Sequence, residues 1–361
     1  MKKRYLKALA AAVCLVILLL PGFAVGAEAP STEAGSSFSV HYIDVGQADA
    51  ALVECDGHYM LIDGGNRADS ERIYTVLKKA GAEKLDIVVA SHAHEDHIGG
   101  LPGAFSYAEA GLTLCPVQEY DSEVFETFRE YAGKRGGGIT VPEAGDKYEL
   151  GSAVVEILGL NCAEGSNNSS IVLRIDYGET SFLFTGDAER EAELHLLDSG
   201  AELAAAVLKL GHHGSDTSST YPFLRAVMPE YAVISVGEGN SYGHPEAGPI
   251  SRLRDAGAQI LRTDINGDII ISSDGAKLSV KTDRAADSDS LLIPGGESES
   301  LAVTAEKPEE SAAPPEEERV WTGPGGSKYH REQNCSGMEA AEEISLEEAE
   351  HRGYTPCKKC W

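Results

Sequence analysis

The segment that most restricts how this chain can fold runs from residue 85 to residue 100 and reads LDIVVASHAHEDHIGG. Its first half is an apolar run rich in β-branched residues, Ile87 to Ala90, which is typical of a buried strand. Imidazole and carboxylate ligands suit borderline divalent metals such as zinc or manganese. A tract of unrelated surface histidines is the simpler alternative, but the compact spacing at a strand end favours a metal site. The expected ligands in the loop after this strand are His92, His94, Asp96 and His97.

The HAHEDH segment fits the H-x-H-x-D-H signature of the metallo-β-lactamase fold, and further segments extend the likeness. The chain resembles the hydrolase domain of ComEC-type competence proteins. The segments that carry this resemblance, in order between about residues 38 and 283, are YIDVGQADA, LIDGG, SHAHEDHIGGL, NNSSIVL, FLFTGD, LGHHGS and YGHP. The resemblance implies a four-layer αββα sandwich. The alternation of strands and helices by itself predicts only an α/β domain with a large sheet.

The resemblance also implies a catalytic centre with two divalent metal ions, zinc or manganese. His92 and His94 would bind the first ion, and Asp96 and His97 the second. Asp187 follows the strand FLFTG and takes the place of the family's bridging carboxylate, although it could also cap the helix that follows. The metal ions would lower the pKa of a bound water, which Asp96 would help to orient.

Three further segments at strand ends supply candidate site residues. His212 matches the last metal histidine of the family, with the neighbouring His213 as the alternative. His244 precedes a proline and lies near substrate in the resemblance, whereas an isolated histidine there could equally be structural. Asp44 corresponds to the first motif and is expected to orient a ligating histidine. The loop around Ser215 offers hydroxyl and N–H groups that could hold a phosphate.

The chain departs from most two-metal members at one ligand of the first metal. No histidine occurs from Ile98 to Gly186, where such members supply a third one. ComEC-like sequences place Asn-Asn-x-Ser there, which is Asn167 to Ser170 in this chain. Asn168 could bind the metal through its amide oxygen, which would favour manganese. The alternative is that the asparagines cap a turn.

Residues 1–29 have the sequence of a secretory signal peptide. A basic start is followed by an apolar run to Leu20 and by small residues that suit cleavage. An uncleaved membrane anchor is the alternative. The mature protein is therefore expected to be secreted or extracytoplasmic, and to be tethered at its N-terminus if the anchor remains. No second stretch is long and apolar enough to span a bilayer, so a transmembrane DNA channel is not expected.

The hydrolase domain is expected over residues 38–283, followed by a different kind of sequence. Residues 284–319 are rich in acidic residues and proline, which predicts a disordered linker. Residues 320–361 resemble small C-terminal zinc-binding modules of exported bacterial proteins. Because so small a module has little apolar core, we expect one structural zinc. A disulfide or a redox Cys-x-x-Cys are the alternatives. The expected zinc ligands are His330, Cys335, Cys357 and Cys360.

The resemblance predicts an exported nuclease or phosphodiesterase that acts on DNA. The formal net charge of −28 opposes this, because an acidic surface repels polyanions. Part of that charge lies in the linker, and bound metal ions would offset more of it locally. A small-molecule metallohydrolase acting on a lactone, a β-lactam or a cyclic nucleotide is the first alternative. A non-catalytic protein, anchored at the cell envelope by its C-terminal module, is the second.

Overall fold

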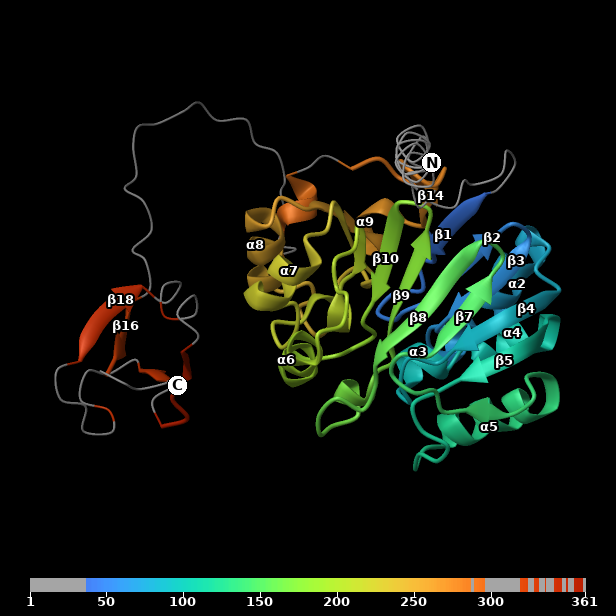
Figure 1. Ribbon diagram of the computed structural model, residues 1–361, viewed down its shortest axis with the longest axis horizontal. Coiled ribbons are helices and arrows are strands. Elements are labelled where there is room, and N and C mark those ends of the chain that lie inside the picture. Colours follow the sequence, from blue (N-terminus) through green and yellow to red (C-terminus); the bar gives the residue numbers. More distant parts are fainter. Residues whose placement is uncertain are drawn as a thin grey trace, which may run out of the picture.

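The computed structural model describes residues 37–286 and 289–295 and, towards the C-terminus, residues 319–323, 328–330, 335, 341–345, 349 and 354–359. The predicted signal peptide, residues 1–29, lies outside the described residues. Two β-sheets lie face to face between layers of helices (Figure 1). This arrangement confirms the four-layer αββα sandwich that the resemblance predicted.

The first sheet has the strand order β15-β14-β1-β2-β3-β4-β5-β6. Strands β3, β4, β5 and β6 run parallel, and the other neighbours pair antiparallel. Its strands are β1 (Phe38–Tyr42), β2 (Ala51–Cys55), β3 (His58–Ile62), β4 (Lys84–Val89), β5 (Glu109–Leu114), β6 (Ile139–Thr140), β14 (Ile269–Ser273) and β15 (Leu278–Thr282).

The second sheet has the order β13-β12-β11-β10-β9-β8-β7. Strands β10 to β13 run parallel to one another, which places their carboxyl ends at one edge. Its strands are β7 (Lys147–Leu150), β8 (Ala153–Gly159), β9 (Val172–Tyr177), β10 (Thr180–Phe184), β11 (Val207–Lys209), β12 (Tyr231–Ile234) and β13 (Gln259–Arg262).

An apolar core fills the space between the two sheets. Phe38 of β1 stacks on Tyr177 of β9, with ring centroids 5.0 Å apart, and also contacts Phe182 of β10. Tyr42 stacks on Phe184 in the same way, at 5.8 Å. All of these rings are almost completely buried. Since each contact joins a ring of β1 in the first sheet to a ring of β9 or β10 in the second, the stacks fix how the sheets lie on one another.

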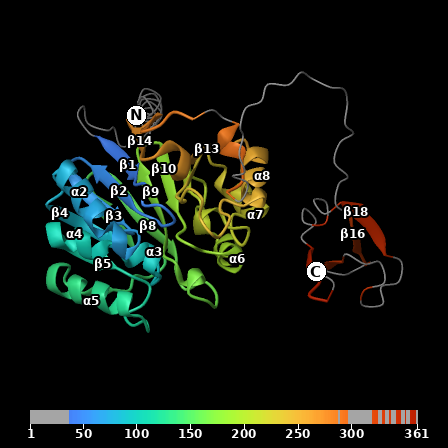
Figure 2. The same cartoon turned by 180° about the vertical axis from the view of Figure 1, so that it is seen from behind.

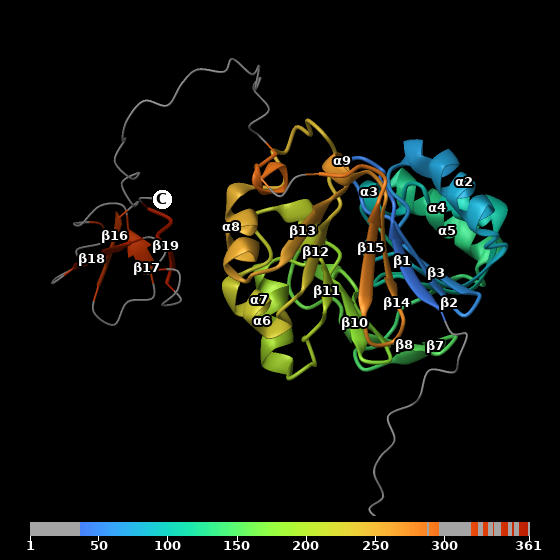
Figure 3. The same cartoon turned by 90° about the horizontal axis from the view of Figure 1, so that it is seen from above.

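Helices cover the outer face of each sheet (Figures 2 and 3). Helices α2 (Ser70–Ala80), α4 (Leu101–Tyr107) and α5 (Glu123–Arg135) cover the first sheet. Helices α6 (Arg190–Ser199), α7 (Tyr221–Val227) and α8 (Ala247–Asp255) cover the second. The short helices α3 (Glu95–Ile98) and α9 (Thr263–Asn266) lie in loops at strand ends. Apolar side chains at helical spacing explain this coverage, as Ile73, Val76 and Leu77 of α2 are buried.

Local sequence signals predict some of these elements and miss others. The pair Asp56-Gly57 predicts a hairpin turn, and both residues have positive φ angles in the turn between β2 and β3. Gly81 predicts the end of a helix, and α2 ends there in the left-handed conformation. The sequence predicts a strand at residues 113–117, whereas β5 begins earlier, because Glu109 already pairs with Lys84 of β4. The first residues of β5 are exposed or only partly buried, so the strand has a weak apolar pattern.

Residues after β15 pack against the domain, although the sequence predicted a linker from residue 284. Ser290–Leu292 form a short 3-10 helix, η4, and Leu292 packs on the outer core of the second sheet. Arg262 donates a hydrogen bond to the carbonyl of Ile293. Gly295 N donates to the carbonyl of Pro245, 2.8 Å away. Residues 289–295 therefore belong to the folded unit.

A small sheet forms near the C-terminus, with the order β18-β16-β17-β19. It has a minimal apolar cluster of Val320, Tyr329, Ile344 and Ala349. Its strands are β16 (Arg319–Thr322), β17 (Lys328–His330), β18 (Glu342–Ser345) and β19 (Thr355–Pro356). Among the described residues of the whole chain, no helix combines the length and apolar character needed to cross a membrane.

Candidate metal centre

The carboxyl ends of parallel strands from both sheets bring the predicted ligands together. Strand β4 leads to His92 and α3, β10 leads to Asp187, and β11 leads to His212. Because each of these strands points its carboxyl end at the same edge, residues nearly 100 positions apart become neighbours. Four groups offer ligand atoms that all lie within 4.8 Å of one another: Asp96, His97, Asp187 and His213.

The two oxygens of Asp187 face two different sets of histidines. Oδ1 lies 3.3 Å from His97 Nε2 and 3.7 Å from His213 Nε2. Oδ2 lies 3.8 Å from His92 Nε2 and 3.7 Å from His212 Nε2. Such a placement suits a carboxylate shared by two metal ions.

Each set is completed by a neighbour from the signature segment. His94 Nδ1 lies 3.0 Å from His92 Nε2, and Asp96 Oδ2 lies 3.2 Å from His213 Nε2. His212 and His213 have positive φ angles, 49° and 53°, in the turn Gly211–Gly214. This unusual backbone lets two adjacent residues face different sets. The sequence treated them as alternatives, whereas the geometry brings both to Asp187.

The donor set fits divalent cations. His97 Nε2 and Asp187 Oδ1 are buried and have no hydrogen-bond partner, although buried polar atoms are normally satisfied. Two carboxylates and several imidazoles converging on one point form the ligand chemistry of zinc or manganese.

Protonation states in the protein also suit metal binding. Burial lowers the pKa of His92 far below its ordinary value, and it lowers the pKa of His94 as well, so both imidazoles are neutral. Burial raises the pKa of Asp187, but His97 and His213 outweigh this and hold it well below its usual range. Burial lowers the pKa of His213, yet Asp187 and Asp49 raise it to about 10. A bound cation would therefore take the place of a proton at His213.

Two buried carboxylates that the sequence did not single out hold the ligands in place. Asp63 Oδ2 bonds His97 Nδ1 at 2.9 Å, while its two oxygens accept hydrogen bonds from the N–H and hydroxyl of Ser91. His213 Nδ1 bonds the carbonyl of Ser235 at 3.0 Å and lies 3.2 Å from Asp49 Oδ1. The other oxygen of Asp49 pairs with the buried ammonium of Lys209 at 2.7 Å. The sequence signal that could have identified Asp63 is its position at the end of a strand, directly before Gly64-Gly65.

Asp44, which the sequence placed in this supporting role, lies elsewhere. Its carboxylate accepts a hydrogen bond from Gly46 N and lies 3.7 Å from Arg284. Its own N–H donates to Asp268. None of the contacts described for Asp44 involves a predicted metal ligand. Asp63 and Asp49 make those contacts instead.

The two asparagines have different surroundings. Asn168 donates from Nδ2 to the carbonyl of Glu164 and accepts the N–H of Glu189 at Oδ1, both at 3.0 Å. Both ends of its side-chain amide therefore form hydrogen bonds with backbone groups, as expected of a turn cap. Asn167 is closer to the centre, since its Nδ2 lies 3.5 Å from His212 Nε2. Its Oδ1 is buried without a hydrogen-bond partner.

The remaining candidates border the centre. His244 Nδ1 lies 3.3 Å from Gln47 Nε2, and its ring lies 5.8 Å from that of His212. Ser215 Oγ donates to Glu246 Oε1 at 3.4 Å, and Asp216 N donates to the same oxygen. A carboxylate thus already accepts the donors that were expected to hold a phosphate.

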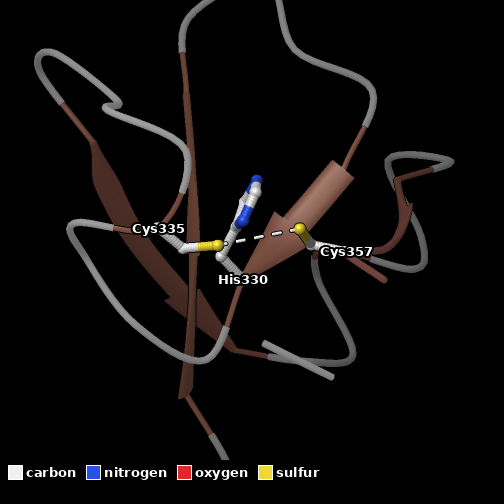
Figure 4. A group of neighbouring side chains, drawn as sticks. All are labelled: His330, Cys335 and Cys357. Carbon is white, nitrogen blue, oxygen red and sulfur yellow. Dashed lines mark hydrogen bonds between the residues drawn. The ribbon is translucent and has the colours of Figure 1, made fainter. Parts of the chain in front are cut away.

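A second cluster lies in the small C-terminal sheet (Figure 4). His330, Cys335 and Cys357 each place one ligand atom within 4.8 Å of the others, and all three are buried. The two sulfur atoms lie 3.7 Å apart and are not joined by a disulfide. Cys360, the fourth expected ligand, lies outside the described residues. Three converging soft ligands are consistent with the predicted structural zinc.

The comparisons with known proteins agree with this geometry. The profile of the metallo-beta-lactamase superfamily matches residues 43–238. Competence protein ComA of Neisseria gonorrhoeae is 33% identical over 255 residues, which cover 70% of this chain and 34% of that protein. ComE operon protein 3 of Bacillus subtilis is 28% identical over 254 residues, which cover 65% of this chain and 33% of that protein.

The chain spans about a third of the length of these relatives. Among solved structures, the metallo-beta-lactamase fold protein YhfI from Bacillus subtilis aligns with 62% of this chain and 96% of its own, at 14% identity and a TM-score of 0.43.

Proposed function

Because the chain belongs to the metallo-beta-lactamase superfamily and is a metal-dependent hydrolase, we propose that it is a phosphodiesterase or nuclease that hydrolyses DNA. The observation that carries this proposal is the position of Asp187 between two sets of histidines. Phosphodiester hydrolysis by paired metal ions needs a shared ligand of this kind. The similarity to two proteins named for competence supports DNA as the substrate.

We assign one set of ligands to each oxygen of Asp187. His92, His94 and His212 would hold the first metal ion with Oδ2, so His212 supplies the third histidine that the sequence seemed to lack. The second ion would be held, with Oδ1, by Asp96, His97 and His213. In this assignment Asn168 is a turn cap and not a ligand.

The bound metal ions would supply a water of lowered pKa as the nucleophile. The protein's own residues would fix where this water attacks. Asp63 bonds Nδ1 of His97 and the carbonyl of Ser235 bonds Nδ1 of His213, so that each Nε2 faces the centre. Asp49 lies beside His213 Nδ1, at 3.2 Å. Asp96 has a side chain that is 31% exposed, so it can orient a water at the entrance. His244 borders the same entrance, where a substrate would lie.

A small-molecule metallohydrolase is the second candidate, because the rim of the centre is acidic. Glu189 lies 3.3 Å from His212, and Glu246 lies 3.8 Å from His244. These carboxylates would repel the many phosphates of a long strand far more than a neutral lactone, or a β-lactam or cyclic nucleotide with a single negative charge. With either activity, we propose that the protein is exported from the cytoplasm and is retained at the cell envelope through its C-terminal module.

The test is to incubate the purified protein with linear and circular DNA, with added manganese or zinc and with a chelator. We expect metal-dependent cleavage that Asp187→Ala abolishes, together with a loss of bound metal and an unchanged circular dichroism spectrum. Asp198→Ala, on the exposed end of α6, is the matched control and should remain active. Hydrolysis of chromogenic esters or lactones without cleavage of DNA would overturn the proposal in favour of the second candidate.

A further inference from the structure

An exposed aromatic side chain lies at the entrance to the candidate metal centre. Tyr242 is 70% exposed, which is unusual for a large side chain in a folded domain. Its ring stacks on that of His244, with centroids 5.7 Å apart and planes inclined by 26°. The ring of His244 in turn lies 5.8 Å from that of His212. A series of rings thus leads from the ligands of the centre to solvent.

The loop that carries this stack is held firmly. Asn240 Oδ1 accepts the N–H groups of Tyr242 and His244, at 3.2 Å and 3.0 Å. Its Nδ2 donates to the carbonyls of Gly237 and His244. The side-chain amide of Asn240 therefore bonds residues both before and after it in the loop. A ring that is held in place before binding loses little conformational entropy when a ligand stacks on it.

A neighbouring segment supports the same loop from behind. Gly295 lies so close to the carbonyl of His244 that a Cβ atom at Gly295 would come within 1.8 Å of the carbonyl oxygen. Residue 295 must therefore lack a side chain for the segment to pack here. With one face of Tyr242 on His244, the exposure of the ring leaves its other face open to a flat ligand.

We propose that the open face of Tyr242 stacks a nucleobase of single-stranded DNA next to the phosphodiester that is hydrolysed. This inference rests on the proposed function, since it names how that site holds its substrate. Base stacking on an aromatic side chain needs no positive charge and tolerates any base. It therefore explains how an acidic rim could bind a nucleic acid, for which phosphate contacts are the usual source of affinity. Bases in a duplex are already stacked and paired, so a single strand is favoured.

The first measurement is steady-state cleavage of a single-stranded oligonucleotide by the full chain and by Tyr242→Ala. We expect KM to rise about 5- to 150-fold in the variant, with kcat within about twofold, because stacking contributes roughly 1–3 kcal/mol per base. Tyr242→Phe keeps the ring and should behave like the wild type. On a strand that carries abasic residues in place of nucleotides, wild type and Tyr242→Ala should become equal. Met228→Ala is the matched control, since Met228 has the same 70% exposure at the far end of α7.

The second measurement is fluorescence anisotropy of a labelled single strand with Asp187→Ala, which binds without turnover, and with Asp187→Ala/Tyr242→Ala. Weaker binding of the double variant supports the stack, even if the wild type cleaves no DNA and the nuclease proposal fails. Cleavage by Tyr242→Ala with unchanged KM overturns the stack and leaves the nuclease proposal standing. If neither variant binds the strand and the wild type cleaves no DNA, both proposals are wrong.

Discussion

Residues around the candidate metal centre either supply ligand atoms or hold the ligating side chains in place. The sequence motif identifies only the first kind. The signature residues present ligand atoms, whereas Asp63 and the carbonyl of Ser235 bond the Nδ1 atoms of His97 and His213. A ligand whose ring is free to rotate must be ordered when the metal binds, which weakens the affinity. Buried acceptors on Nδ1 remove that freedom before binding.

Asp63→Asn should therefore weaken metal binding without removing a ligand. We expect the affinity of the second metal to fall about 10- to 100-fold, the usual effect of losing such a supporting contact. Competition with a chromogenic chelator measures this affinity. Asp44→Asn is the control, because Asp44 bonds Gly46 and Asp268 instead. The metal affinity of this variant should stay within about twofold of the wild-type value. Equal affinities for wild type and Asp63→Asn would show that the contact does not support the centre.

The residues that the sequence identified best are those tied to strand ends. His92, Asp187 and His212 each follow an apolar run, and the loop after a buried strand is where ligands gather. Asp63 also ends a strand, but its role depends on the ring of His97 folding back onto it. Asp44 was predicted to orient a histidine because of its position in the first motif. Position in the sequence does not reveal which carboxylate contacts a given imidazole ring.

At the scale of elements, the parallel strands determine where the centre forms, and polar contacts fix how the outer elements meet them. Asp268, just before β14, accepts hydrogen bonds from a strand, a helix and the loop after β1. His41 Nε2 of β1 lies 2.9 Å away, Arg72 of α2 lies 2.6 Å away, and the N–H of Asp44 lies 2.9 Å away. The carboxylate thus ties the helix to both strands at this edge of the sheet.

This carboxylate should make stability depend on pH. Burial raises the pKa of Asp268, but the bonds from His41, Asp44 and Arg72 outweigh this and hold it below its ordinary value. A pKa that is lower in the folded than in the unfolded chain adds stability above about pH 4. That stability is lost as the pH falls towards the folded pKa.

We therefore expect Asp268→Asn to lower the free energy of unfolding by about 2 kcal/mol at pH 7, since hydrogen bonds to a charged group are lost. The difference from wild type should shrink as the pH is lowered below about 4. Urea unfolding of the metal-free proteins at several pH values measures it. Asp198→Asn should stay within about 0.5 kcal/mol of wild type. A difference that is constant from pH 7 to pH 3 would contradict the assignment.

Elements with strong local signals were predicted well, and those that depend on partners were not. The β2–β3 hairpin follows from Asp56-Gly57, and the end of α2 follows from Gly81. Strand β5 owes its early start to pairing with β4, which local sequence does not encode. The short η4 was missed because its docking depends on Arg262 and Pro245, which are distant in sequence.

On the scale of the whole chain, the C-terminal cluster should add one metal ion of its own. Cys357→Ser should lower the zinc content by one ion per chain while leaving the hydrolysis of short strands unchanged, because thiolate ligands are needed for a structural zinc. Native mass spectrometry counts the ions. A chain that ends at Gly295 is the matched control and should lose the same ion. A Cys335–Cys357 disulfide in the exported protein would replace the zinc assignment with a cystine-stapled module.

The docking of Gly295 on Pro245 also sets the place from which the rest of the chain departs. That point adjoins the loop of His244 and Tyr242, and β16 begins 24 residues later at Arg319. Fully extended, such a length reaches roughly 80 Å at most. A strand of DNA gripped by the C-terminal module would then be confined around the entrance at a local concentration on the order of 1 mM. DNA bound by the C-terminal module would stay within reach of the entrance and could be cut more than once, even if the entrance alone holds its substrate weakly.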